Sequence, residues 1–255
     1  MTDAILALWR REIRVFLRDR ARVVGVLAQP VLFWLVFGFG FADSVRIPGS
    51  DADYLSFLLP GMVALTVLFT AIYSTLSVVE DRQSGVLQAA LVAPQPRAVL
   101  VLGVVLGGTT LAVGQAALIG LAAPTVGLSP GLGGGLVSLA AGALLAITFC
   151  AFGFVMAWRL RTTRAYHAIM NVVLVPVWLL SGAFFPESGA SGVVGLAMRL
   201  NPATYGVGML RYGMEGLPPS ISGSSLSLVV CAVASVGAAV VALAAAVSVA
   251  RRVPA

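Results

Sequence analysis

The chain has 255 residues, of which 59% are apolar and only 10% are charged, and its formal net charge is +6. Ordinary globular domains carry about 25% charged residues to cover their exterior. This composition, with a mean hydropathy of +1.00, excludes a soluble fold and predicts an integral membrane protein.

The first 22 residues have the periodicity of an amphipathic helix. At about 100° per residue, large apolar side chains share one face: Ile5, Trp9, Ile13 and Phe16. Arginines occupy the other face: Arg10, Arg11, Arg14, Arg18 and Arg22. A basic amphipathic helix lies along the membrane surface, with its arginines near anionic headgroups. Residues 1–22 are therefore predicted to be a cytoplasmic interfacial helix that contacts membrane lipid.

Six stretches are long and apolar enough to cross a bilayer, whose core of about 30 Å needs about 20 helical residues. They cover approximately residues 23–42, 57–79, 98–123, 135–158, 165–185 and 226–250. Pro30 and Pro176 fall inside two of them, which membrane helices tolerate where neighbours satisfy the freed carbonyl groups. The sequence therefore predicts an all-α integral membrane protein in which a six-span domain, residues 23–255, follows the interfacial helix.

The connection between the second and third predicted spans combines charge with a short amphipathic pattern. It opens with Glu80, Asp81 and Arg82, passes Gly85, and continues with apolar residues at helical spacing until Pro94. Proline cannot continue a helix, so Pro94 should end it. The apolar face of such a helix needs cover, either from the bilayer or from a groove in another protein.

The connection between the fifth and sixth predicted spans, residues 186–225, is too interrupted to cross the membrane. Its apolar residues lie on both sides of Asn201-Pro202. This pattern predicts two short helices that dip back into the outer leaflet, sheltered by protein. A plain exposed loop is the alternative interpretation.

The positions of the arginines predict the orientation. Of the 16 arginines, 13 lie in the N-terminal segment, the second-to-third and fourth-to-fifth connections and the tail, and the others are Arg46, Arg199 and Arg211. With five carboxylates on each side, the formal charge is +8 on the first side and −2 on the second. The positive-inside rule therefore predicts a multi-pass protein of the cell membrane with both termini in the cytoplasm.

In these features the chain resembles the type-2 permeases of ATP-binding-cassette (ABC) exporters, which export drugs, antibiotics and polysaccharides. The resemblance covers nearly the whole length and is densest at Leu59-Pro60-Gly61-Met62, at Glu80-Asp81-Arg82 with Gly85 and Leu87, at Pro94 with Arg97 and Gly103, and at Asn201-Pro202-Ala203-Thr204-Tyr205 followed by Arg211. One position departs from the family pattern, because Val86 stands where a Thr is common.

The resemblance implies a half-transporter. Two six-span chains, identical or different, would form one pathway above two copies of a separate ABC ATPase, which would hold ATP and Mg, and this chain would bind no cofactor. The helix after Gly85 would be the coupling helix that contacts the ATPase, and the segment around Asn201 would be a re-entrant hairpin that closes the exit. The implied coupling residues are Glu80, Asp81, Arg82, Gly85, Leu87, Pro94 and Arg97. The implied outer gate consists of Asn201, Pro202, Tyr205 and Arg211.

The predicted spans carry little fixed charge, which suits a hydrophobic, amphipathic or lipid-linked substrate better than a small ion. Aromatic and polar positions in three of the spans are candidates for the substrate pathway. They are Phe33, Trp34, Phe69, Tyr73, Asn171 and Trp178.

A self-contained channel or secondary transporter is the alternative function. An ion-coupled carrier needs an ionisable group at membrane depth, but all ten carboxylates lie in loops or near span ends. The deepest polar side chains are Gln29, Gln115, Asn171 and His167. An intramembrane protease is a more distant alternative, because Gly189-Ala190-Ser191-Gly192 matches the Gly-x-Ser-Gly pattern of rhomboid-type enzymes. No histidine follows Ser191 to act as its base.

Several other functions are excluded by residue type. All 16 basic residues are arginines, and a Walker-type ATPase needs a lysine. One histidine and two separated cysteines, Cys150 and Cys231, do not form a metal-ligand pattern. The arginines follow the predicted topology instead of forming one patch, which argues against nucleic-acid binding. The sequence therefore predicts a transport subunit and not an enzyme.

Overall fold

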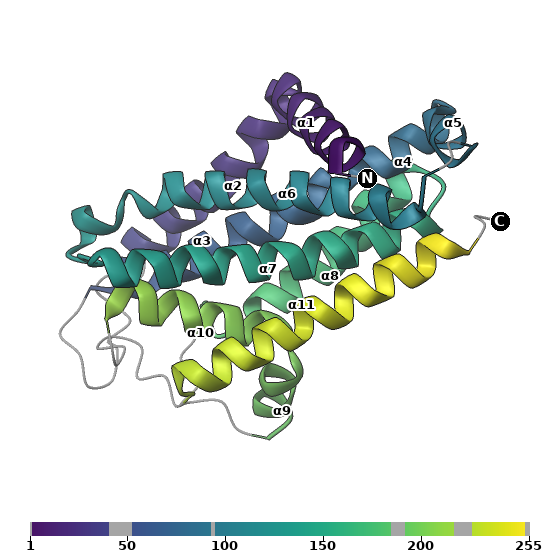
Figure 1. Cartoon of the computed structure of the whole chain (residues 1–255). Coiled ribbons are helices and arrows are strands. Elements are labelled where there is room, and N and C mark those ends of the chain that lie inside the picture. The colour runs from purple at the N-terminus through teal and green to yellow at the C-terminus, as the bar shows by residue number, and fades with distance from the viewer. Residues whose placement is uncertain (1, 41–52, 93–94, 185–191, 217–225, 253–255) are drawn as a thin grey trace.

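The computed structural model describes residues 2–40, 53–92, 95–184, 192–216 and 226–252, and every regular element in these ranges is helical (Figure 1). In chain order the helices are α1 Thr2–Arg18, α2 Arg20–Gly40, α3 Tyr54–Ser74, α4 Leu76–Gln83, α5 Val86–Val92, α6 Arg97–Gly120, the 3-10 helix η1 Ala123–Val126, α7 Leu132–Arg159, α8 Thr163–Leu179, α9 Gly192–Leu200, α10 Pro202–Glu215 and α11 Leu228–Arg251.

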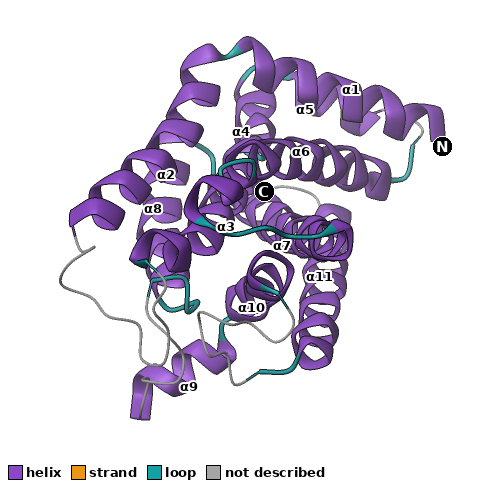
Figure 2. Ribbon diagram, turned by 90° about the vertical axis from the view of Figure 1, so that its left-hand side faces the viewer, coloured by secondary structure: helices purple, strands orange, loops and turns teal. Residues whose placement is uncertain are grey.

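Helix α1 lies on the outside of the bundle against α6 (Figures 1 and 2). The indole Nε1 of Trp9 donates a hydrogen bond of 3.0 Å to Thr110 Oγ1 on α6. Helix α1 ends at Arg18 because Asp19 caps the next helix. The Asp19 carboxylate accepts a 3.0 Å hydrogen bond from the backbone N–H of Arg22. The amphipathic helix therefore ends four residues earlier than its predicted limit at residue 22.

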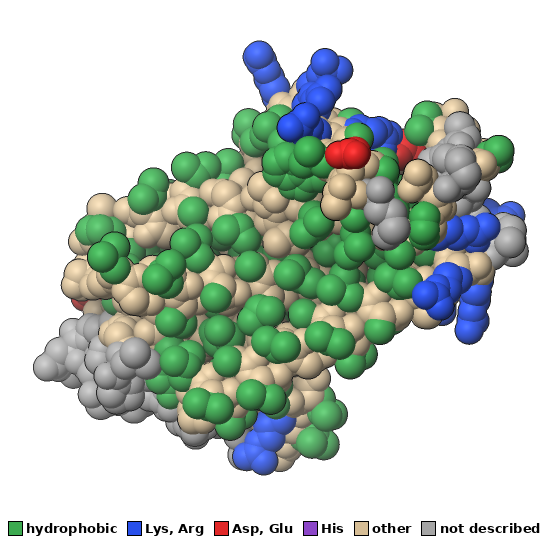
Figure 3. Space-filling model, in the orientation of Figure 1, with side chains coloured by type: hydrophobic (Ala, Val, Ile, Leu, Met, Phe, Trp, Pro, Cys, Tyr) green, Lys and Arg blue, Asp and Glu red, His purple; other side chains and the backbone are tan. Residues whose placement is uncertain are grey.

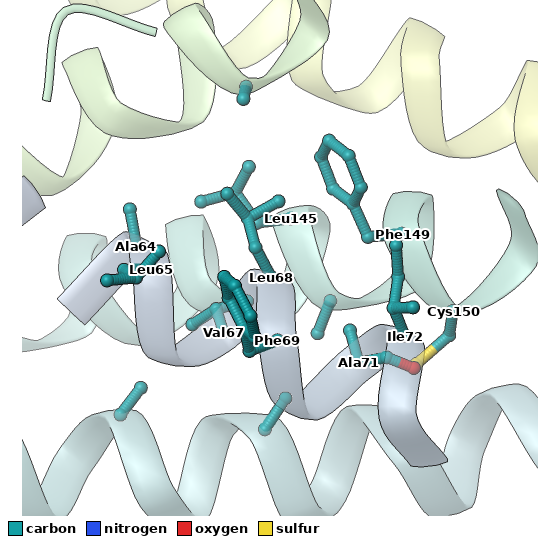
Figure 4. Packing of buried hydrophobic residues seen from close by; sticks show 14 of the residues in the cluster. Ala64, Leu65, Val67, Leu68, Phe69, Ala71, Ile72, Leu145, Phe149 and Cys150 are labelled. Atoms are coloured by element: carbon teal, nitrogen blue, oxygen red, sulfur yellow. The ribbon is translucent and has the colours of Figure 1, made fainter. Parts of the chain in front are cut away.

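Helices α3 and α4 form the centre of the molecule, separated only by a turn at Thr75. Figure 2 shows α3 surrounded by α2, α6, α7, α8 and α10, and nearly all of its side chains are buried. Leu68 and Ile72 of α3 lie beside Leu145 and Phe149 of α7 (Figure 4). Such close-packed apolar contacts fix the position of α3 relative to its neighbours.

Among the described residues, five helices are long and apolar enough to cross a membrane: residues 20–40, 54–83, 97–120, 132–159 and 228–251. They match the first, second, third, fourth and sixth predicted spans. The fifth predicted span, residues 165–185, coincides with α8, which has only 17 residues, and residue 185 lies outside the described residues. Five such helices make this a multi-pass membrane protein, and the count of six stays a prediction.

The surface separates apolar and charged regions (Figure 3). Hydrophobic side chains cover the body of the molecule, and most basic side chains gather along the margins that carry α1 and the C-terminal end of α11. Helices α2 and α11 are the least covered of the five long apolar helices. Leu32 and Phe39 on α2 and Val229 and Val241 on α11 are exposed, which is the kind of surface that lipid or another protein covers.

Replacing Gly103 by Val should loosen α1 from α6. A Cβ at Gly103 would lie 2.5 Å from the Cβ of Leu8, and overpacking of this kind costs about 1–3 kcal/mol. The Tm of the purified protein should therefore fall. Gly114→Val is the matched control on the same helix, because a Cβ at Gly114 has no atom within 4 Å. Equal Tm values for the two variants would contradict this account of how α1 docks.

Candidate functional site

Two arginines join α1 and the start of α2 to α4. Both terminal nitrogens of Arg11 bind the carboxylate of Asp81, with Nη1 at 2.7 Å from Oδ2. Arg22 Nη2 donates to Glu80 Oε1 at 2.7 Å. The hydrogen bond to Asp81 is the main cause that raises the pKa of Arg11 above its ordinary value, against the opposing effect of burial. Glu80 and Asp81 are therefore already paired within the chain.

Glu12 is a buried carboxyl group in the same contact, with only 3% of its surface exposed. Its Oε2 accepts a 2.7 Å hydrogen bond from Ser77 Oγ, and its Oε1 lies 3.0 Å from Arg11 Nη1. Burial raises the pKa of Glu12. The sequence analysis missed this residue, although Glu12 follows Ile5 by seven positions and precedes Phe16 by four, which places it on the apolar face.

Arg82 caps the C-terminal end of α7. Its guanidinium donates to the carbonyl oxygens of Trp158 at 2.6 Å, Leu160 at 2.8 Å and Ala157 at 3.4 Å. It also lies 5.7 Å from the centre of the Trp158 ring. The last carbonyls of a helix lack partners within the helix, so Arg82 satisfies them and ties α4 to α7.

Arg97, at the start of α6, does the same for α11. Its Nη1 donates to the carbonyl oxygens of Ala250 and Arg251, both at 3.1 Å. At this end of the molecule the bonds of Arg11, Arg22 and Arg82 join α1, α2 and α7 to α4, and Arg97 joins α6 to α11.

Helix α5 stands at this same end of the molecule (Figure 1), and two of its valines are exposed. Gly85 joins α4 to α5 in the left-handed region, with φ +81°, which glycine adopts without steric cost. Leu87 is only 3% exposed and packs into the core, whereas Val86 is 46% exposed and Val92 is 86% exposed. The implied coupling residue Pro94 lies outside the described residues.

At the far end, α9 and α10 meet at Asn201. The Asn201 side chain accepts from the N–H of Ala203 at 3.0 Å, which caps α10, and donates to the carbonyl of Val177 on α8 at 2.6 Å. Pro202 is the first residue of α10, a position where its missing N–H is not needed. Tyr205 donates its hydroxyl proton to the carbonyl of Arg199 at 2.7 Å. These bonds fix the two helices against α8.

Arg211 is buried, with 4% of its surface exposed. Its guanidinium donates to the carbonyls of Phe57 at 3.1 Å and Gly182 at 2.9 Å, and to Glu215 Oε1 at 2.9 Å. It lies 4.1 Å from the centre of the Phe57 ring. Arg211 therefore ties α10 to the beginning of α3 and to the turn after α8.

The six predicted pathway residues fall into two groups. In the first, Phe33 stacks on Trp178 with ring centres 6.2 Å apart, and Trp34 donates to the carbonyl of Leu55 at 3.1 Å. In the second, Tyr73 lies 5.8 Å from the Phe69 ring and donates to Asn171 Oδ1 at 3.0 Å. Phe69 and Trp178 are buried, whereas the other four are at least partly accessible.

A cavity of about 480 Å³ adjoins the second group. It lies between the α1–α2 junction, α8, and the rod that α3 and α4 form together over residues 54–83, called the α3–α4 rod. Its polar lining consists of Asp19, Arg22, Gln29, Glu80, Thr163 and His167. The cavity therefore connects the paired charges of α2 and α4 with the aromatic rings of α3.

The described residues add no support for a metal site or for a protease-like active site. Among the described residues, no group of three His, Cys, Asp or Glu side chains could hold a metal ion. Ser191 of the protease-like motif lies outside the described residues. Of the deep polar side chains, Gln115 accepts a 2.6 Å hydrogen bond from Thr70 and Asn171 is bound by Tyr73.

A family model described as ABC-2 type transporter matches residues 3–214. Nodulation protein J of Rhizobium leguminosarum bv. trifolii is 28% identical over 216 residues, which cover 84% of this chain and 82% of the relative. The putative transport permease ycf38 of Cyanophora paradoxa is 27% identical over 205 residues, which cover 78% of this chain and 71% of the relative. The family match begins in α1 and ends in α10, so it includes both the arginine contacts of α4 and the Asn201 junction.

Replacing Arg82 by Ala should destabilise the end of α7. The change leaves the carbonyls of residues 157, 158 and 160 without their donor, and hydrogen bonds from charged groups contribute about 1.5–3 kcal/mol each. Amide hydrogen exchange of the last turn of α7 should become faster, and the Tm should fall. Arg159→Ala, which removes an exposed arginine from the same turn, is the control. Equal exchange in both variants would disprove the capping role.

The stability of the folded protein should respond to the ionisation of Glu12. A carboxyl whose pKa is raised by folding binds its proton more tightly in the folded state, so its ionisation costs stability. The cost is absent below the ordinary pKa of 4.5, grows as the pH rises above it, and is complete above the raised pKa. The wild type should therefore gain Tm relative to the isosteric Glu12→Gln variant as the pH falls towards 4.5. A Tm difference independent of pH would contradict this prediction.

Proposed function

Because this chain belongs to the ABC-2 type transporter family, we propose that it is the membrane-spanning permease subunit of an ABC exporter. The family and the apolar helices make it a multi-pass membrane transport permease. In the proposed complex it moves a hydrophobic, amphipathic or lipid-linked substrate outward, and a separate ATPase subunit supplies the energy. The observation that carries the proposal is the family match over residues 3–214.

Helix α5 is the proposed contact with the ATPase. Its exposed Val86 and Val92 offer an apolar surface that a groove of the partner would cover, while Leu87 anchors α5 in the chain's own core. A displacement of α5 by the ATPase would be transmitted to α4. Helix α4 is joined to α1 by Asp81 and to α7 by Arg82. In this scheme the partner binds ATP and Mg, and the permease converts its movement into a rigid-body shift of helices.

The proposed assembly contains two permease chains, identical or different, and two ATPase copies. The exposed apolar surfaces of α2 and α11 supply area both for a second permease chain and for membrane lipid. The interfacial helix α1, with its outward Arg10, Arg14 and Arg18, lies at the lipid headgroups in this arrangement.

We further propose six spans, with α8 as the fifth. At 1.5 Å per residue its 17 residues extend about 26 Å, slightly less than the bilayer core of about 30 Å, and membranes accommodate such a mismatch at modest cost. In this topology the protein lies in the cell membrane and both of its termini lie in the cytoplasm, as the arginine distribution predicts.

The α9–α10 hairpin is the proposed outer gate. Asn201 and Arg211 bind it to α8, to the turn after α8 and to the start of α3. These contacts hold the hairpin closed over the route past the aromatic residues Phe33, Trp34 and Trp178. Opening would require the bonds of Arg211 to rearrange, and ATP binding by the partner would supply the driving force in this scheme.

The proposal predicts that an ABC ATPase co-purifies with the tagged chain from its native membrane after gentle solubilisation. Val92→Asp should abolish this association because it places a charge in the proposed apolar contact, whereas Val92→Ala should weaken it only slightly.

Leu87→Ala should lower the Tm of the chain, because it removes core contacts at a cost of about 2–5 kcal/mol.

Two results would overturn the prediction of co-purification. A chain that purifies without any ATPase would favour the self-contained channel or carrier. Retention of the ATPase by Val92→Asp, with an unchanged ratio of the two proteins on a stained gel, would remove α5 from the interface.

A further inference from the structure

The residues that line the cavity beside α8 favour one class of substrate over others. It is bounded by Val26 of α2, Phe69, Tyr73 and Leu76 of the α3–α4 rod, and the first turns of α8. Its volume of about 480 Å³ lies within the range of roughly 300–1,000 Å³ that is typical of small-molecule sites. The inference below rests on the proposed transport function and concerns the class of substrate.

The charged groups of the lining leave an excess of negative charge. Arg22 is the cation among them, and it is shared between two carboxylates, with Nη2 at 2.7 Å from Glu80 and Nε at 3.3 Å from Asp19. Two carboxylates and one guanidinium give a formal charge of −1 at the cavity wall. Arg18 and Arg20 flank Asp19 in the sequence but do not line the cavity.

The remaining polar side chains of the lining are available to a ligand. Within the part of the chain that the structure describes, the side chains of Gln29, Thr163 and His167 make no hydrogen bond. They come from α2 on one side and α8 on the other. A bound molecule can therefore use donors and acceptors on opposite walls without displacing a hydrogen bond of these three side chains.

Aromatic rings form the wall next to these groups. Tyr73 stands between two other rings, with its centre 5.8 Å from that of Phe69 and 5.3 Å from that of His167. The faces of Phe and Tyr rings attract organic cations by about 0.5–2 kcal/mol. Val26 and Leu76 continue the wall with hydrocarbon surface.

From this combination we propose that the cavity binds an amphiphilic organic cation, with its positive head near Glu80 and its apolar body against Tyr73, Phe69 and Leu76. The carboxylate excess disfavours an anionic head, because like charges repel. A neutral head would gain the hydrogen bonds of Gln29 and Thr163 but not the attraction of the charge.

The test compares two ions of similar shape and opposite charge on the full-length chain in phosphatidylcholine nanodiscs. Saturable binding of radiolabelled tetraphenylphosphonium is expected, with little competition from tetraphenylborate. Glu80→Gln should weaken cation binding roughly tenfold, since one carboxylate near a cation contributes on the order of a tenfold factor at intermediate dielectric. Asp81→Asn makes the same change of charge at the next residue, which binds Arg11 outside the cavity, and should leave binding within about twofold of wild type.

If Glu80→Gln does not fold, a second pair of variants tests whether the cavity binds the cation. Tyr73→Leu removes the ring and should weaken tetraphenylphosphonium binding roughly three- to tenfold, whereas Tyr73→Phe keeps the ring and should bind like the wild type. Gel filtration confirms that each variant is folded before binding is measured.

Three outcomes would overturn the inference: no saturable cation binding, tetraphenylborate binding as tightly as the cation, or equal weakening by Glu80→Gln and Asp81→Asn. Because binding is measured without the ATPase, its failure in a chain that still co-purifies with an ATPase rejects the substrate class alone. Cation binding by a chain that lacks an ATPase partner would instead reject the exporter proposal and keep the site.

Discussion

The carbonyl groups at the ends of apolar helices need hydrogen-bond donors, and arginines from neighbouring helices supply them in this molecule. Arg82 reaches the last turn of α7 and Arg97 the last turn of α11. An unpaired carbonyl near hydrocarbon costs several kcal/mol, so these bonds determine how the helices sit at this end. The carboxylates of Glu80 and Asp81 then receive Arg22 and Arg11. Residues 80–82, a single turn of helix, thereby contact α1, α2 and α7 at once.

Much of this architecture can be predicted from the sequence, because hydropathy and periodicity depend only on residues that are close together in the chain. Five of the six predicted spans correspond to helices that are long enough to cross a membrane, and the 3.6-residue period predicted α1. The partners of the polar residues were not predictable in the same way. Periodicity places Arg82 beside a turn, but it does not show that the carbonyls it binds lie about 75 positions further along. The resemblance implies that Leu87 is a coupling residue, yet the fold turns Leu87 inward and leaves Val86 and Val92 outside.

The length of α8 shows why hydropathy alone misplaces a boundary. The sequence remains apolar as far as residue 185, but the helix ends at Leu179. Gly182 adopts φ +77°, which breaks the helical path, and Arg211 binds its carbonyl at 2.9 Å. A hydropathy window counts the apolar residues of this turn as helix because it contains no information on backbone conformation or on an arginine that arrives from α10.

The α3–α4 rod links the two ends of the molecule. At one end Arg211 holds the carbonyl of Phe57, and at the other end Glu80, Asp81 and Arg82 bind three neighbouring helices. Between them the rod is almost fully buried, and close-packed interiors move as units instead of deforming continuously. In the proposed cycle a push on α5 would therefore shift the rod as a whole and strain the bonds of Arg211 at the outer hairpin. Glu80 belongs both to this rod and to the cavity wall, so a cation that competes with Arg22 for its carboxylate would loosen α2 from α4. Filling of the cavity and movement of the rod would then be coupled through one side chain.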